Sequence, residues 1–148
     1  MRKNVEVSYL CGLLHNVGAP VLLNRIAAID PGLPDNDVQQ IVDLLASRAG
    51  LILVEEWSLP SAVGVAIRYQ GCMEEAKNAK DLVAIVDTGR ILSQRLSGVS
   101  DEEAALEALP IAELVQLPQM QHLNIYPDDA QELYTHVQHI DEVVRGMS

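Results

Sequence analysis

The sequence predicts an all-α protein that folds as one irregular bundle of helices. Apolar residues recur at spacings of three and four, the period of a helix with one face in a core, and no stretch shows the alternation of a half-buried strand. Apolar residues make up 49% of the chain, aromatic residues make up 3%, and Phe is absent. The core must therefore consist of Leu, Val, Ile and Ala, and a length of 148 residues suits a single domain, residues 1–148.

Proline and glycine divide the first half of the chain into four expected helices. These helices should cover residues 4–17, 20–29, 35–57 and 60–69, with a loop at 30–35. Pro20 suits the first turn of the second helix, and the side chain of Asp35 or Asn36 can cap the third. One side of the first helix should face the core through Tyr9, Leu10, Leu13, Leu14 and Val17.

The third of these helices is apolar on two faces. One face carries Val38, Ile41, Val42, Leu45, Ala49 and Ile52, and the other carries Leu44, Leu51 and Leu53. A helix that is apolar all round must be covered on all sides, so we expect it to be buried almost completely. Trp57 at its end should also be largely buried, and its replacement by Ala should cost about 3–5 kcal/mol.

The second half of the chain predicts a long helix, two short ones and a long last helix. The first long helix should cover residues 80–96, and Ser100 with Glu103 forms a capping box for a short helix. Another short helix should follow Pro110, and Pro127 opens the last helix. The inward stripe of this last helix consists of Ala130, Leu133, Tyr134, Val137, Ile140 and Val144.

Charge and cysteine content limit the cellular setting. The net charge of −11 repels phosphate groups, so neither nucleic acid nor an anionic membrane is an expected partner. Cys11 and Cys72 lie in apolar surroundings and are expected to be buried free thiols in a reducing compartment. No signal-peptide cleavage site follows the apolar stretch 7–14, and no apolar run approaches the ~20 residues of a membrane span, so we expect a cytoplasmic protein.

Three short blocks of sequence resemble those of a known family. Residues 9–18, YLCGLLHNVG, resemble the pattern F-L-x-G-L-L-H-D-I-G. Gly50, Trp57 and residues 59–60 look like the pattern G-x-x-L-L-x-x-W-x-L-P, and residues 66–69 are similar to a segment that ordinarily ends in two histidines. In this order and at this spacing the blocks resemble the HDOD domain, the HD-related output domain of bacterial signalling proteins.

The resemblance covers residues 2–97 and implies an HD-like helical bundle with a regulatory role and no catalysis. Residues 98–148 are C-terminal helices that fit the family more loosely. The usual domain also has several helices before the first block, and these have no counterpart in this sequence.

The resemblance further implies a remnant of the HD metal pocket. An HD phosphohydrolase uses His and Asp ligands to hold metal ions that activate water. Here the adjacent pair is His15 and Asn16, whose amide supplies no negative charge, and the spacing of the family places Ala46 and Gln70 where histidines are expected. We therefore expect no catalytic residue, no metal and no cofactor at this site. His15 alone would then be an ordinary boundary residue, bonded to a backbone carbonyl or to Asn16.

A second possible metal site lies on the last expected helix. Glu132, His136 and His139 fall within about 60° of one another on its polar side. Two imidazoles and a carboxylate can hold a transition metal, but a solvated helix face explains the same pattern. We favour the solvated face.

These observations favour a non-catalytic, protein-binding module in bacterial signal transduction. One alternative is a sensor that binds a small ligand such as a nucleotide at His15, Asn16, Ala46 and Gln70, and another is a metal-dependent phosphohydrolase. Because the third helix needs cover that the missing N-terminal helices would normally give, we also expect a homodimer. Its interface should bury more than about 1,000 Å² and use part of the first 57 residues, unless the C-terminal helices fold back instead.

Overall fold

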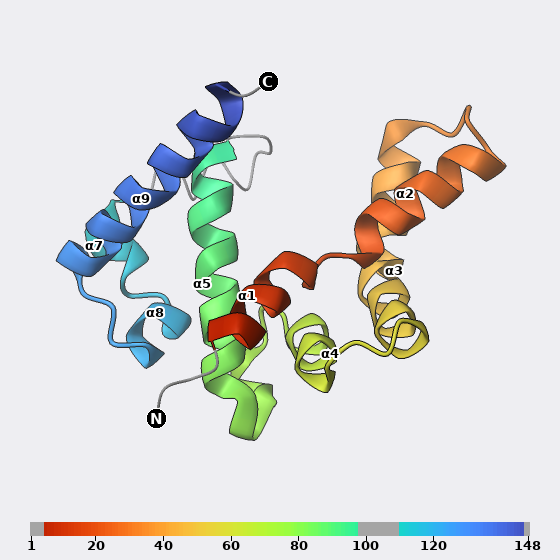
Figure 1. The fold of residues 1–148 in the computed structure, drawn as a ribbon. Helices are drawn as coiled ribbons and strands as arrows, with labels where there is room; N and C mark the ends of the chain where they lie inside the picture. The colour runs from red at the N-terminus through yellow and green to blue at the C-terminus, as the bar shows by residue number, and fades with distance from the viewer. Residues whose placement is uncertain (1–4, 98–109, 147–148) are drawn as a thin grey trace. The chain divides into compact units, whose positions relative to one another are not determined.

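The computed structural model describes residues 5–97 and 110–146, and the prediction of an all-α helical bundle is confirmed there (Figure 1). No strand occurs in these two ranges. The chain divides into two compact units, one up to Val86 and one from Asp87 onward. The long helix α5 (Lys80–Ser97) contributes to both units.

The helices begin and end close to the predicted positions. The first unit contains α1 (Val5–Leu14), α2 (Gly18–Ile29), α3 (Asp35–Glu56), α4 (Ser61–Arg68) and the 3₁₀ segment η1 (Met73–Ala79). The second contains α7 (Ile111–Leu114), α8 (Pro118–His122) and α9 (Pro127–Gly146). The η1 segment and α8 were not expected, and the helix expected from Ser100 and Glu103 lies outside the described residues.

Proline, and not a capping side chain, sets the start of α3 and α4. Pro34 and Pro60 occupy the N-cap positions in extended backbone, and neither helix start has a side-chain cap. The expected cap by Asp35 or Asn36 is therefore wrong. Asp35 and Asp37 instead lie in the first turn of α3, where the helix dipole favours negative charge.

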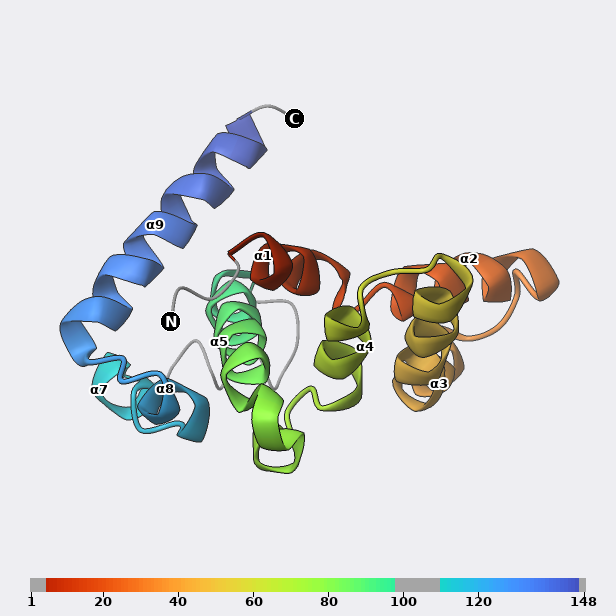
Figure 2. The same cartoon turned by 60° about the horizontal axis from the view of Figure 1, so that its bottom comes forward.

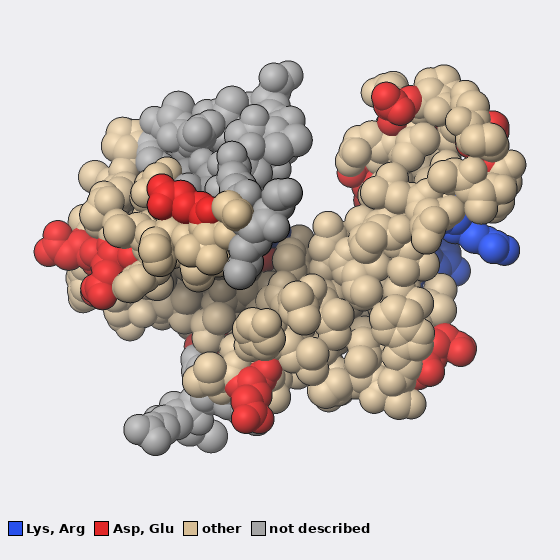
Figure 3. Space-filling model, turned by 45° about the horizontal axis from the view of Figure 1, so that its top comes forward, with Lys and Arg blue, Asp and Glu red and all other residues tan. Residues whose placement is uncertain are grey.

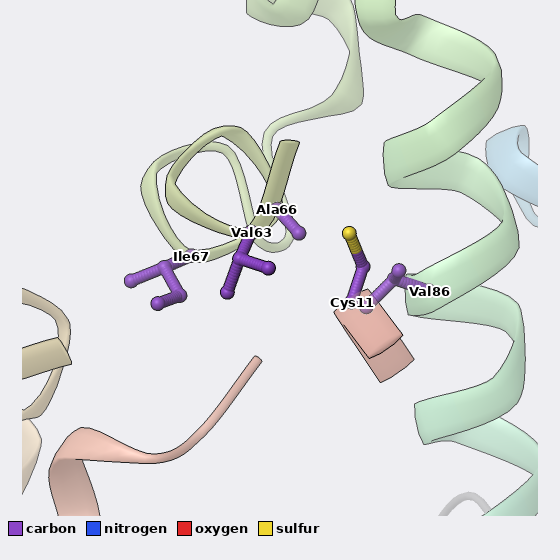
Figure 4. Close-up of a cluster of buried hydrophobic side chains, with 5 residues drawn as sticks. All are labelled: Cys11, Val63, Ala66, Ile67 and Val86. Carbon is purple, nitrogen blue, oxygen red and sulfur yellow. The ribbon is translucent and has the colours of Figure 1, made fainter. Parts of the chain in front are cut away.

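The core of the first unit lies between α1, α4 and the beginning of α5 (Figure 4). It consists of the buried residues Cys11, Val63, Ala66, Ile67 and Val86. Leu10 and Leu14 of α1 pack against this cluster, whereas Tyr9 and Leu13 are mostly exposed. The predicted face of α1 is therefore confirmed for Leu10, Leu14 and Val17 and wrong for Tyr9 and Leu13. The helix is apolar on nearly every side, and Cys11 is its most deeply buried residue.

The helices α2 and α3 run side by side as an antiparallel pair (Figures 1 and 2). Gly18, at the start of α2, lies directly against the backbone of Ala46 and Gly50 in α3. Gly50 in turn lies against the side chain of Ile67 in α4. Small residues of α3 therefore allow close packing on two sides of this helix.

The prediction that α3 is buried nearly all round was wrong. Only Val42 and Gly50 of α3 are buried, while Leu44 is 80% exposed and Ile52 is 53% exposed. Trp57 is 54% exposed, so the prediction of a buried indole was also wrong, and the cost expected for removing a core aromatic does not apply. The reason is that α3 packs chiefly against α2 and α4, which leaves a third side in water.

Among the described residues of the second unit, Ile91, Leu92, Leu114 and Met120 form a buried hydrophobic cluster. On α9 the predicted stripe is only partly confirmed. Ala130 is buried and Tyr134 and Val137 are half-buried, but Leu133 and Ile140 are exposed. The inward side of α9 is therefore narrower than its apolar pattern indicated.

The 25-residue segment Val5–Ile29 contains an 18-residue window with a mean hydropathy of 1.2, so by length and composition it could cross a membrane. The expectation that no stretch approaches such a span was therefore wrong. One such segment is weak evidence of a span, because core helices and signal sequences pass the same test. A turn at residues 15–17 also divides this segment into α1 and α2.

Candidate functional site

A surface groove lies between the last turns of α3 and the length of α4, with a volume of about 590 Å³. It is lined by Leu51, Val54, Glu55, Ser58, Leu59, Ser61, Gly64, Val65 and Arg68. Four of these side chains are aliphatic, two carry hydroxyl groups, and Glu55 and Arg68 carry opposite charges. We call this feature the α3–α4 groove.

The turn between the two helices creates the groove. Ser58 has a left-handed backbone (φ 50°), and its N–H donates to the carbonyl of Glu55 at 3.1 Å. The N–H of Leu59 donates to the carbonyl of Val54 at 3.0 Å, which ends α3 in a Schellman motif. The extended backbone of Pro60 then starts α4 across the end of α3.

Gly64 keeps the groove open. A methyl group at this position would lie 3.6 Å from Val54 Cγ1 and 3.7 Å from Leu51 Cδ2, which is ordinary van der Waals contact. Alanine therefore fits, whereas a longer side chain would extend into the space that a ligand would use. This role of Gly64 was not predicted, because a glycine within an apolar helix gives no local indication of what it faces.

Trp57 immediately precedes the lining residue Ser58, and more than half of its surface is in water. Large exposed apolar side chains beside a concave surface are typical of interaction sites. The left-handed Ser58 is a second such feature, because backbone strain at a residue other than glycine is often found at ligand sites.

The residues of the predicted remnant pocket do not line this groove. The Nδ1–H of His15 donates to the carbonyl oxygen of Gly12 at 2.6 Å, one of the two partners considered for it. The close contact of Gly18 with Ala46 brings the segment after Asn16 against α3. Gln70 follows the end of α4 and is half-buried. The pocket formed by His15, Asn16, Ala46 and Gln70 stays a prediction.

The residues proposed as a metal site on α9 lie on an exposed surface. His136 Nε2 is 3.6 Å from Glu132 Oε1, and both side chains are more than 70% exposed. His139 is exposed as well. Within residues 5–97 and 110–146, no group of three His, Cys, Asp or Glu side chains is arranged to hold a metal.

The two cysteines differ in environment. Cys11 lies in the first core, and burial raises the pKa of its thiol. Cys72 is exposed, so the prediction that both thiols are buried was wrong for Cys72. Its position just before η1, outside the regular helices, explains why helical periodicity did not place it.

Polar residues inside α5 are a further feature that the sequence analysis missed. Asp87 and Thr88 are buried in the middle of an apolar helix. Arg90 Nε lies 3.9 Å from Asp87 Oδ1, and Arg90 Nη1 donates to Gln94 Oε1 at 2.8 Å. In the sequence, the adjacent Asp87 and Thr88 interrupt the apolar residues of α5, and this interruption could have indicated buried polar groups.

Comparison with known proteins gave no relative: no family model, no curated protein and no solved structure matches the chain. On the face shown in Figure 3, acidic side chains form separate groups on a mostly uncharged surface, and basic side chains are few.

Proposed function

We propose that this protein is a non-catalytic regulatory module that binds a protein partner in a bacterial signalling pathway. The observation that carries the proposal is the α3–α4 groove, which has an aliphatic lining and a charge of each sign. The exposed Trp57 precedes the lining residue Ser58 in the chain. The resemblance of residues 2–97 to the HDOD domain supports the regulatory role.

The chemistry of the groove suits an amphipathic helix of the partner. Grooves between two helices commonly accept such a helix, whose apolar side chains enter the groove. Leu51, Val54 and Val65 provide aliphatic contacts for these side chains. Glu55 and Arg68 then provide polar contacts of opposite sign that can orient the bound helix.

The absence of catalysis is part of the proposal and rests on the sequence. Asn16, Ala46 and Gln70 stand where the family pattern calls for metal ligands. The two alternatives, a nucleotide sensor and a metal-dependent phosphohydrolase, have direct assays. A nucleotide that binds should raise the melting temperature, and a hydrolase of this type should purify with stoichiometric metal.

The proposal places the module in the cytoplasm, with neither nucleic acid nor a membrane as its partner. The net charge of −11 supports this, because it repels phosphate backbones and anionic lipids. Both cysteines are free, which suits a reducing compartment.

The test is to block the groove without disturbing the fold. Gly64→Leu should fill the α3–α4 groove, whereas Gly64→Ala places only a methyl group at ordinary contact distance and serves as the matched control. We expect a partner captured by the wild-type protein and by Gly64→Ala to be lost with Gly64→Leu. Calorimetry with the purified partner should show affinity weakened by more than about tenfold.

Circular dichroism of both variants must show unchanged helix content for the comparison to hold. Equal capture of every partner by the two variants would contradict binding in the groove.

A further inference from the structure

One exposed face of α3 carries a short stripe with an acid at one end and a base at the other. Asp37, Ile41, Leu44 and Arg48 follow the spacing i, i+4, i+7, i+11, which places them along one line of an α-helix. Leu44 is 80% exposed, Asp37 and Arg48 are exposed, and Ile41 is half-buried. We call these four residues the α3 stripe.

The other described helices of the first unit do not cover the α3 stripe. The opposite side of α3 packs on α2, and its later turns pack on α4. Leu45, which flanks the stripe, is 42% exposed and enlarges the apolar surface. Leu44 buries little of its apolar surface in a monomer, and several neighbouring exposed apolar groups indicate a contact surface.

We infer that a second copy of this chain covers the α3 stripe, with the two α3 helices packed antiparallel. The two-fold axis passes between Ile41 and Leu44. Ile41 then faces Leu44 of the partner subunit, and Leu44 faces Ile41 of the partner subunit. At the two ends of the contact, Asp37 lies beside Arg48 of the partner subunit and Arg48 beside Asp37 of the partner subunit.

The charges of Asp37 and Arg48 favour the antiparallel orientation and this register over the others. In a parallel pair, Asp37 would lie beside Asp37 of the partner subunit, and like charges at this distance repel. An antiparallel pair centred on Ala46 would oppose Asp37 to Glu55 of the partner subunit. Arg48 is the sole basic residue of the α3 sequence. The register centred between Ile41 and Leu44 is the one that places Arg48 beside Asp37 of the partner subunit. This register also keeps both apolar residues in the contact.

Self-complementarity also favours a second copy over an unrelated protein. When a two-fold axis relates two copies, the acidic end of each stripe lies beside the basic end of the other. The contact then has two identical ion pairs, one at each end, with the apolar residues between them. No residue of the α3 stripe lines the α3–α4 groove, so Leu44→Glu tests the stripe and Gly64→Leu tests the groove, and this inference and the proposed function can fail independently.

The first experiment measures association of the full chain by analytical ultracentrifugation over a range of micromolar concentrations. We expect a reversible dimer of the wild-type protein and a dissociation constant raised at least about tenfold by Leu44→Glu. Leu13→Glu is the matched control, because Leu13 is also a mostly exposed leucine of a helix but lies on α1. It should leave the dimer unchanged.

The second experiment exchanges the charges. Asp37→Arg and Arg48→Asp should each weaken the dimer, and the double variant should restore an affinity close to that of the wild-type protein. A monomeric wild-type chain, a dimer insensitive to Leu44→Glu, or a double variant no better than the single ones would overturn the inference. Loss of capture with Gly64→Leu would leave it unaffected, since that variant tests the groove.

Discussion

Gly18 holds α2 against α3 at a distance that no residue with a side chain can reach. A methyl group at this position would overlap the carbonyl oxygen of Ala46 and would lie 2.6 Å from the backbone nitrogen of Gly50. Both neighbours are backbone atoms inside a helix, so neither can move without disturbing its own hydrogen bonds. The close approach of α2 to α3 at this point therefore requires a glycine.

We therefore predict that Gly18→Ala destabilises the protein by about 3 kcal/mol through overpacking. Gly12→Ala is the matched control, because Gly12 is exposed within α1 and a methyl group there has nothing within 4 Å. It should stabilise the protein by up to about 1 kcal/mol, the difference in helix propensity. Urea unfolding measures the change in the free energy of unfolding for each variant. A similar change at the two positions would contradict the close contact of Gly18 with Ala46.

At the scale of a helix, the end of α3 is held by backbone hydrogen bonds around a strained residue. Ser58 takes the left-handed position that glycine usually occupies in a Schellman motif. The end of α8 repeats the arrangement with Asn124 (φ 55°), and asparagine accepts this conformation more readily than serine. The α3–α4 groove therefore lies at a helix end where the strained backbone of Ser58 lowers the stability of the fold.

We predict that Ser58→Gly stabilises the protein by about 1 kcal/mol, because glycine adopts the left-handed conformation without steric cost. Ser58→Ala retains the strain and should give no gain. Thermal or urea unfolding distinguishes the two variants. A stabilisation by alanine equal to that by glycine would mean that the serine hydroxyl, and not the backbone, is responsible.

At the scale of the whole molecule, one helix belongs to both cores. The first half of α5 places Val86 in the core of the first unit, and its second half places Ile91 and Leu92 in the core of the second. Gly89 lies between these positions, exposed, with nothing within 4 Å of an added methyl group. Both cores therefore receive residues from one helix, α5, and Gly89 lies in this helix between those residues.

We predict that Gly89→Ala raises the free energy of unfolding by up to about 1 kcal/mol and that both units show the increase. Trp57 fluorescence reports on the first unit, and far-UV circular dichroism reports on all helices. The two signals should shift together in urea. Gly146→Ala at the end of α9 is the control and should have little effect, because the last turn of a helix gains little from propensity. A shift seen by circular dichroism alone would show that the units unfold separately.

The candidate site was only partly accessible from the sequence. The break at residues 58–60, the proline that starts α4 and the exposed charges Glu55 and Arg68 are all local features. The groove itself depends on how α4 crosses α3, which places Gly64 opposite Leu51 and Val54. The periodicity of one helix does not specify its distances to residues of another helix. The sequence pattern therefore predicted a site at His15 and Asn16 instead.

The sequence by itself determined that this protein is helical and where α3, α4 and α9 begin. The three- and four-residue spacing has no alternative in a strand, and Pro34, Pro60 and Pro127 cannot continue a preceding helix. Only the tertiary structure decided which sides of α1 and α3 are buried, and therefore that Leu44 and Trp57 lie in water. The physical reason is that a helix with one apolar face specifies its own orientation, whereas a helix that is apolar on several faces leaves that choice to the neighbours that pack against it.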